Sequence, residues 1–420
     1  MAPVPSVGRA FFPLDEELGL LGGGLTPRAE EVLVRLASWM PFARARELLE
    51  ELVGVQVSKA TARRATLGAG AAALAVLEEE AKRLKQELPE VPKGAEKQVM
   101  SADGAMVLLV GGEWAEVKTL VIGEVTCNKR GEICTQHLSS FSRLSAVESF
   151  EEAALVETHR RGVEKATAVC AVQDGAEWLP GFVDYHRADA VRILDFAHAA
   201  EHISDLGNAA IDAGSGLASD WLSKQLHELK HHGPSQVLAD LRALVAKHPE
   251  VKELSDHLAY LQKREAQMQY PTFQAAGWPI GSGCVESTNK VVVQARLKGA
   301  GMRWERTNVN PMLVLRNAVC NGCWHETWQA SSKQRQHTRQ QLRDARTQAR
   351  CEQAVARLMK LLLWCMPPTP RLPVEPVPPP VSLPTSVPLE GASSPHRPAA
   401  NHPWRRPLVV RPKEGALAKK

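Results

Sequence analysis

Apolar residues between positions 26 and 98 recur at the three- and four-residue spacing typical of helices. Thr26-Pro27 opens the segment, Gly54 interrupts it, and Ser58 is placed to cap a second helix. That second helix carries three basic residues: Lys59, Arg63 and Arg64. A helix, a short turn and a basic second helix have the form of a helix-turn-helix. Two interpretations stay open here, a DNA-binding domain and ordinary helical packing.

From about residue 97 the pattern changes to short apolar runs typical of strands. Strands are predicted over 98–103, 106–110, 117–125, 166–172 and 190–194, with helices over 146–162 and 176–185. The order strand, strand, strand, helix, strand, helix, strand predicts a mixed α/β sheet. Asp103, Asp174 and Asp195 are expected at or near strand ends, where ligands bind in open α/β sheets.

Residues 196–270 are predicted to be wholly helical and are followed by a loop over 271–283. A helix is expected over 284–296, and a long basic helix over 331–363. The predicted organisation is a flexible N-terminus (1–25), a helical domain (26–96), the first part of a sheet core (97–195), an all-helical insertion (196–280), the end of the core (281–325), a basic helical segment (326–365) and a disordered tail (366–420). The tail holds 15 of the 28 prolines, which is typical of an extended segment without a core.

The net charge of +4 conceals an uneven distribution of charged residues. Residues 1–289 carry 29 basic and 40 acidic side chains, whereas residues 290–365 carry 14 basic and 4 acidic ones. This asymmetry favours either a basic C-terminal part that binds a polyanion or a solvated basic helix followed by a basic tail.

Length and composition exclude several classes of protein. A chain of 420 residues with 44% apolar residues is expected to form two or three domains with proper cores. No apolar run approaches the roughly 18 residues of a membrane helix, and the start lacks a secretory signal pattern. Eight cysteines are too few for a disulfide scaffold in a chain of this length. A cytoplasmic protein without a membrane partner is therefore expected.

Asp103, Asp174 and Glu286 are candidates for a metal site. Asp103 and Asp174 precede glycines near strand ends, and Glu286 lies in the first turn of a predicted helix. Converging carboxylates suit Mg²⁺, and two such ions can support phosphodiester displacement. The alternative is that the Asp-Gly pairs only form turns and that Glu286 is a helix N-terminal acid.

Two other patterns carry possible metal chemistry. His198, Glu201 and His202 form an H-x-x-E-H sequence, the signature of inverted zinc peptidases. This interpretation leaves Asp103 and Asp174 unexplained. Cys320 and Cys323 have C-x-x-C spacing but lack a second pair at zinc-finger distance, so reduced thiols are expected.

Five motifs resemble, in order, those of the ISKra4 family of bacterial DDE transposases. They are Ser101-Ala-Asp103-Gly-Ala, Asp174-Gly-Ala-Glu-Trp178, Asp195-Phe-Ala-His198-Ala-Ala-Glu-His202, Gly281-Ser-Gly-Cys-Val-Glu286-Ser-Thr-Asn-Lys290 and Arg296-Leu-Lys-Gly-Ala-Gly-Met-Arg-Trp304. The resemblance covers about residues 97–320. Ser287 stands where the family usually has Ala, and Ala300 where Arg is frequent; neither change removes a carboxylate.

The resemblance implies an RNase H-like mixed sheet core, interrupted by the helical insertion. It places a catalytic triad at Asp103, Asp174 and Glu286, holding two Mg²⁺ ions that Mn²⁺ can replace. The implied activity is cleavage at the ends of an insertion sequence, freeing a 3′-OH that attacks target DNA. Asp195 and His198 resemble a secondary motif that holds the active site or the DNA, and a structural pair is the alternative.

The implied partner is double-stranded DNA, bound by a homo-oligomer in the cytoplasm at the nucleoid. Phosphate contacts are expected from Arg296, Lys298, Arg303 and Arg306, together with the basic residues of the helix-turn-helix. Trp304 is expected either to stack on an exposed base or to pack in the core. A non-enzymatic helix-turn-helix regulator is the main alternative function, and it predicts no dependence on Mg²⁺.

Overall fold

The computed structural model describes residues 25–365, which belong to two units divided after Arg350. The predicted flexible N-terminus, apart from Leu25, and the predicted tail over 366–420 lie outside the described residues. In the second unit, residues 351–365 form the end of a helix with exposed apolar side chains such as Leu358, Leu362 and Trp364.

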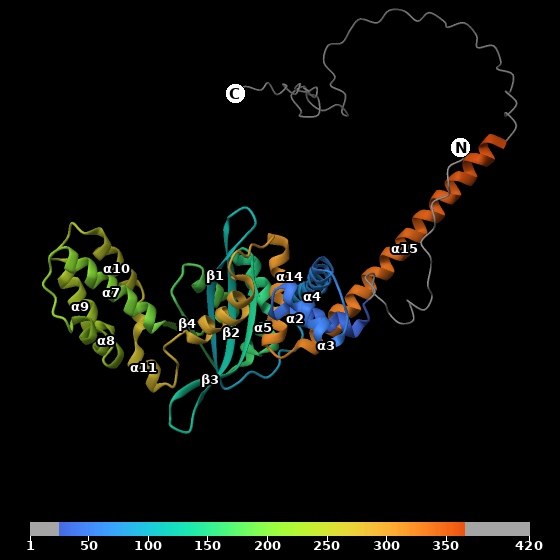
Figure 1. Ribbon diagram of the computed structural model, residues 1–420. Coiled ribbons are helices and arrows are strands. Elements are labelled where there is room, and N and C mark those ends of the chain that lie inside the picture. Colours follow the sequence, from blue (N-terminus) through green and yellow to red (C-terminus); the bar gives the residue numbers. More distant parts are fainter. Residues whose placement is uncertain (1–24, 366–420) are drawn as a thin grey trace, which may run out of the picture. The chain divides into compact units, whose positions relative to one another are not determined.

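The centre of the first unit is a five-stranded sheet with the order β3-β2-β1-β4-β5 (Figure 1). Its strands are β1 (Lys97–Leu108), β2 (Trp114–Cys127), β3 (Ile133–Arg143), β4 (Ala168–Gln173) and β5 (Val191–Leu194). The strands β1, β2 and β3 pair antiparallel, while β4 and β5 run parallel to β1. The prediction of a mixed α/β sheet is therefore confirmed.

Two of the predicted strands are a single strand, and one strand was missed. β1 continues through the Asp103-Gly104 pair because these residues pair with Thr119 and Lys118 of β2. The local preference of Asp-Gly for a turn is overridden by this antiparallel ladder. The prediction that Asp103 lies at or near a strand end is thus wrong: it lies in the middle of β1. β3 was missed because its polar sequence lacks a clear apolar alternation.

Helices α5 (Val147–Arg160) and α6 (Leu179–Arg187) cover one face of the sheet. Met100 and Ile122 of the sheet pack there against Phe150 and Phe182, whose rings stack with centroids 5.3 Å apart. Side chains on the other face of β1, such as those of Ala105 and Val107, pack against the segment that follows the insertion. The alternation of side chains along β1 thus serves two separate cores.

The insertion is helical, as predicted, and it shares a core with the sheet. It comprises α7 (Phe196–Asp212), α8 (Trp221–His231), α9 (Pro234–Val245), α10 (Lys252–Lys263), η2 (Glu265–Met268) and α11 (Tyr270–Ala275), coloured green to gold in Figure 1. α11 occupies part of the predicted loop over 271–283. Apolar residues of these helices join Cys170, Val172 and Ile193 of β4 and β5 in one buried cluster.

After the insertion the chain forms a continuous helical run followed by an unpredicted helix. The run consists of α12 (Gly283–Thr288), the π-helix η3 (Asn289–Gln294) and α13 (Ala295–Leu297). The next helix, α14 (Arg306–Cys320), contains Pro311, a residue that normally argues against a helix interior. Packing overrides this preference because α14 is almost wholly buried.

The N-terminal helices are α2 (Pro27–Trp39), α3 (Phe42–Val53) and α4 (Lys59–Glu87). The Ser58 hydroxyl accepts from the Thr61 amide at 3.0 Å, which confirms the predicted cap of α4. Two buried arginines of the core join these helices to it: Arg296 donates to the Ala37 carbonyl and Arg316 to the Ser38 carbonyl. The helical domain is therefore packed on the core of the same unit.

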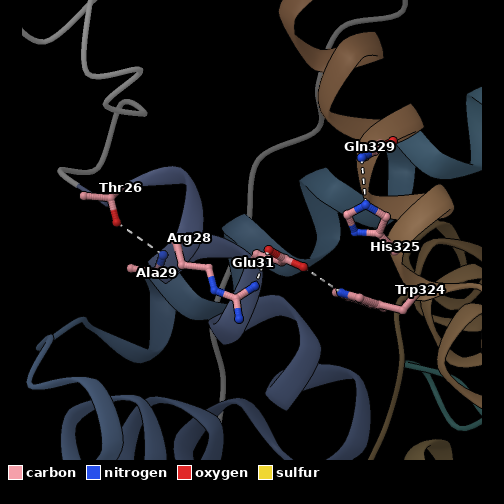
Figure 2. A network of polar contacts seen from close by, with 7 residues as sticks. All are labelled: Thr26, Arg28, Ala29, Glu31, Trp324, His325 and Gln329. Atoms are coloured by element: carbon pink, nitrogen blue, oxygen red, sulfur yellow. Dashed lines mark hydrogen bonds and ion pairs between the residues drawn. The ribbon is translucent and has the colours of Figure 1, made fainter.

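Polar contacts also tie α2 to the start of α15 (Trp324–Cys365), as Figure 2 shows. The Trp324 indole donates to Glu31 at 3.1 Å, and Arg28 pairs with the same carboxylate at 2.8 Å. At the beginning of α2, the Thr26 hydroxyl accepts from the Ala29 amide at 3.3 Å and caps the helix. These bonds hold α2 at its N-terminus and at the face that contacts α15.

Two glycines of α4 provide a matched test of the packing of this helix. A Cβ at Gly70 would lie 2.3 Å from the backbone oxygen of Pro311 in α14, whereas one at Gly68 would meet nothing within 4 Å. Gly70→Ala is expected to destabilise the protein by about 1–3 kcal/mol through overpacking. Gly68→Ala should stabilise it by about 0.5–1 kcal/mol through helix propensity. Urea unfolding measures both, and a stabilising Gly70→Ala would contradict the close approach.

Candidate active site

Asp103, Asp174 and Glu286 line one pocket of about 140 Å³, here called the carboxylate pocket. The same pocket is lined by Asp195, His198 and Glu201. The three predicted triad residues come from β1, from the loop after β4 and from α12, which are far apart in the sequence. The fold therefore brings the predicted triad together, along with the predicted secondary pair.

Asp103 faces the pocket because the sheet is incomplete beside it. β1 pairs with β4 only over Lys97–Val99, so the edge of β1 beyond Val99 is free of β4. The Asp103 carboxylate accepts two hydrogen bonds, from the Gly104 amide at 2.6 Å and from the Asn289 side-chain amide at 2.8 Å. Burial, and secondarily the neighbouring charges of Asp174 and Glu286, raise the pKa of Asp103 above its ordinary value.

Asp174 follows the last residue of β4 and is held by a tight loop. Its carboxylate accepts from the Ala176 amide at 3.0 Å, and Gly175 adopts a φ of 81°, which favours glycine. Two residues of the insertion also bind this loop. The Tyr260 hydroxyl donates to the Asp174 carbonyl, and Arg264 donates to the Gly175 carbonyl. The position of this carboxylate thus depends on α10 as well as on β4.

Glu286 is exposed in the first turn of α12, and its position depends on Asp195. The Asp195 carboxylate is buried and accepts from the Ser282 amide, immediately before α12. Its other oxygen accepts from the His198 amide at 2.9 Å and caps α7. The predicted Asp195–His198 pair is therefore a helix cap, with the His198 imidazole 3.3 Å from a Glu201 oxygen.

Asn289 is a site residue that sequence reasoning missed. It is buried, it begins the π-helix η3, and its amide nitrogen binds Asp103 while its oxygen has no partner among the described residues. The available signal was its spacing, because a residue three positions after Glu286 lies on the same face of a helix.

The H-x-x-E-H residues take part in a different arrangement. His202 lies against Tyr260 with ring centroids 3.8 Å apart, and its Nδ1 is 2.9 Å from Nδ1 of His257. Burial, followed by the charges of His198 and His257, lowers the pKa of His202 to about 4, so the imidazole is neutral at pH 7. Within residues 25–365, no three His, Cys, Asp or Glu side chains are gathered as a ready-made metal site.

The carboxylate pocket offers ligands of the type that Mg²⁺ prefers. Asp103, Asp174 and Glu286 supply only oxygen ligands, which Mg²⁺ prefers. The like charges that raise the pKa of Asp103 are those that a divalent cation would compensate. The residues thus fit such an ion in donor type and charge.

The predicted DNA-binding residues divide into exposed and buried sets. Lys59, Arg63, Arg64, Lys298, Arg303 and Arg306 are exposed, and Arg306 pairs with Glu113 at 2.7 Å. Arg296 is 2% exposed and Trp304 6%, so these two side chains do not belong to the exposed basic surface. The Trp304 backbone instead pairs beside the end of β1: its amide donates to the Leu108 carbonyl, and its carbonyl accepts from the Val110 amide.

The cysteine pair Cys320 and Cys323 lies at the end of α14 with free thiols. Burial raises the pKa of both thiols, which keeps them protonated at pH 7.

Comparison of the sequence with protein-family models gives no match, and comparison with curated proteins gives none either. Among the helices of residues 25–365, none combines the length and the apolar character needed to cross a membrane.

Asp103→Asn is expected to stabilise the metal-free protein. The folded-state pKa of Asp103 is raised, so stability is lost as pH rises from the unfolded-state pKa of about 3.8 through the folded-state value. Asparagine removes this loss, and rotation of the Asn289 amide would present its unpartnered oxygen to the new amide group. Thermal unfolding in EDTA should show a higher Tm for Asp103→Asn at pH 7 and no difference near pH 3.

Asp256→Asn is the matched control, because Asp256 is exposed on α10, outside the pocket. Its Tm should stay equal to that of the unmodified chain at both pH values. A destabilising Asp103→Asn at pH 7 would contradict the electrostatic conflict within the carboxylate pocket.

Proposed function

We propose that the chain is a DDE transposase with an RNase H-like core, which cleaves the ends of an insertion sequence and transfers the freed 3′ ends to target DNA. The observation that carries the proposal is the convergence of Asp103, Asp174 and Glu286 on the carboxylate pocket. The strand order and directions, with three antiparallel strands followed by two parallel ones, are compatible with such a core.

The three carboxylates would hold two Mg²⁺ ions. When bound, such ions supply activation of an attacking oxygen and stabilisation of the leaving oxygen in phosphodiester displacement. The chain's own contribution is orientation: Asn289 and the Gly104 amide fix the two oxygens of Asp103. The Ala176 amide donates to Asp174, and the Ser282 amide, immediately before α12, donates to Asp195.

The basic residues on the surface support the DNA-binding part of the proposal. Lys59, Arg63 and Arg64 are exposed at the start of α4, as expected for a helix that faces DNA. Lys298 and Arg303 are exposed in the loop after α13. Such side chains supply sequence-independent affinity for phosphates, which falls as salt rises.

Asp174→Asn should abolish Mg²⁺-dependent cleavage of a duplex that carries the DNA ends flanking the reading frame. A direct carboxylate ligand is lost, so the rate should fall by more than the roughly 100-fold typical of an outer-shell partner. Binding of the same duplex in EDTA should not change. Asp256→Asn is the control and should cleave normally. An Asp174→Asn variant that cuts as fast as the unmodified chain would refute the triad.

Asn289→Ala tests the orientation of Asp103 separately. The Asp103 oxygen would lose its amide donor while every carboxylate stays in place. Cleavage should fall by roughly 10–100-fold, with a higher Mg²⁺ concentration needed for half the maximal rate. Thr288→Ala, one residue earlier, is the control because the Thr288 hydroxyl donates only to the Cys284 carbonyl. An unchanged Mg²⁺ dependence in Asn289→Ala would show that this contact is dispensable.

A further inference from the structure

A second hollow, of about 500 Å³, lies between the N-terminal helices and the core of the same unit. We call it the basic hollow. The residues of its lining that matter here are Phe42, Lys59, Arg63, Arg296, Arg303 and Trp304. It shares no lining residue with the carboxylate pocket.

The basic hollow has a strong excess of positive charge. Four basic side chains line it, and Glu305 is the one acidic residue among its described lining residues. Lys59, Arg63 and Arg303 form no ion pair with any residue of the described chain. These cations are therefore available to an anionic ligand.

Three helices begin at the hollow. The first turns of α3, α4 and α14 contribute Phe42, Lys59 and Asn308 to its lining. No side chain caps α3 or α14, and in the first turn of α14 the Asn308 amide donates to the Glu305 carbonyl at 2.9 Å. Helix N-termini favour anions, phosphate in particular, because amide groups and the helix dipole act together.

Two buried donors at the hollow lack partners. Arg296 Nη2 and Trp304 Nε1 are enclosed and form no hydrogen bond within the described residues. The Arg296 guanidinium lies between two rings, 4.9 Å from the centroid of Phe42 and 5.0 Å from that of Trp304. Unsatisfied buried donors in a native fold call for a specific explanation, and a bound acceptor provides one.

The apolar part of the lining defines the rest of the ligand. Phe42, Leu67, Val110, Met302 and Trp304 line the hollow beside its basic residues. A volume of about 500 Å³ is typical of pockets that enclose a whole small molecule and exceeds what a phosphate group alone requires. The lining therefore suits a ligand that combines an anionic group with an apolar one.

We propose that the basic hollow binds a single nucleotide turned out of a DNA duplex. Its phosphate lies at the helix N-termini and the basic side chains, and its base lies against the apolar lining. This inference rests on the DNA-binding part of the proposed function and is independent of the cleavage chemistry.

The test compares two duplexes of the same sequence, one fully paired and one with a single unpaired nucleotide. Binding to the full-length chain is measured by fluorescence anisotropy in EDTA, so no cleavage occurs. The unpaired nucleotide avoids the cost of unpairing, and stacking of one base gives about a tenfold preference for the bulged duplex. Arg63→Glu should abolish this preference.

Arg64→Glu is the matched control, because Arg64 is exposed on α4 but does not line the hollow. It should weaken both duplexes equally and leave the tenfold preference unchanged. Equal affinity of the unmodified chain for the two duplexes, together with Mg²⁺-dependent cleavage, would overturn the nucleotide site alone. A chain that bound neither duplex would overturn the DNA-binding proposal as well. If Arg63→Glu and Arg64→Glu both lost the preference for the bulged duplex to the same extent, the basic hollow would not be the source of that preference.

Discussion

The arrangement of the candidate site depends on the buried carboxylate of Asp195. The insertion leaves the core at this residue and returns at Ile280–Ser282, where the Phe196 amide donates to the Ile280 carbonyl at 2.9 Å. One Asp195 oxygen caps α7, and the other accepts from the Ser282 amide. A single side chain therefore joins the start of the insertion to the segment that follows it. Its charge is compensated by amide donors and by the N-terminus of α7 rather than by a cation. This link acts together with the hydrogen bond from Asn289 to Asp103, which also holds the segment of Glu286 at the sheet.

The insertion in turn stabilises the sheet side of the site. Tyr260 and Arg264 bind the carbonyls of Asp174 and Gly175, and the Arg264 guanidinium lies 3.6 Å from the centroid of the Tyr260 ring. Burial raises the pKa of Tyr260 to about 12, so the hydroxyl remains a donor at neutral pH. The helices between β5 and α12 are thus part of the support of the carboxylates. These contacts hold the loop of Asp174 in place against the repulsion between the negatively charged carboxylates of the pocket.

The sequence predicted those parts of the fold in which local pattern and final packing agree. The helices of the insertion, the strands β4 and β5 and the cap at Ser58 belong to this group. Asp103 was misplaced because pairing with β2 overrides the turn preference of Asp-Gly, a contact that local pattern does not reveal. α14 was missed because Pro311 argues against a helix until its packing on α4 is known. For the site, residue type and motif order found the three carboxylates, whereas Asn289 required the geometry of η3.

The charge distribution also takes on a different meaning once burial is known. Part of the basic excess after residue 290 lies inside the fold, since Arg296 and Arg316 are buried and bind backbone carbonyls rather than described carboxylates. Buried guanidinium groups without an acidic partner are costly, and their contacts with the end of α2 show what they stabilise. Arg296 stands at one end of the run from α12 to α13, and Glu286 stands at the other. The same helical run therefore borders both the carboxylate pocket and the basic hollow.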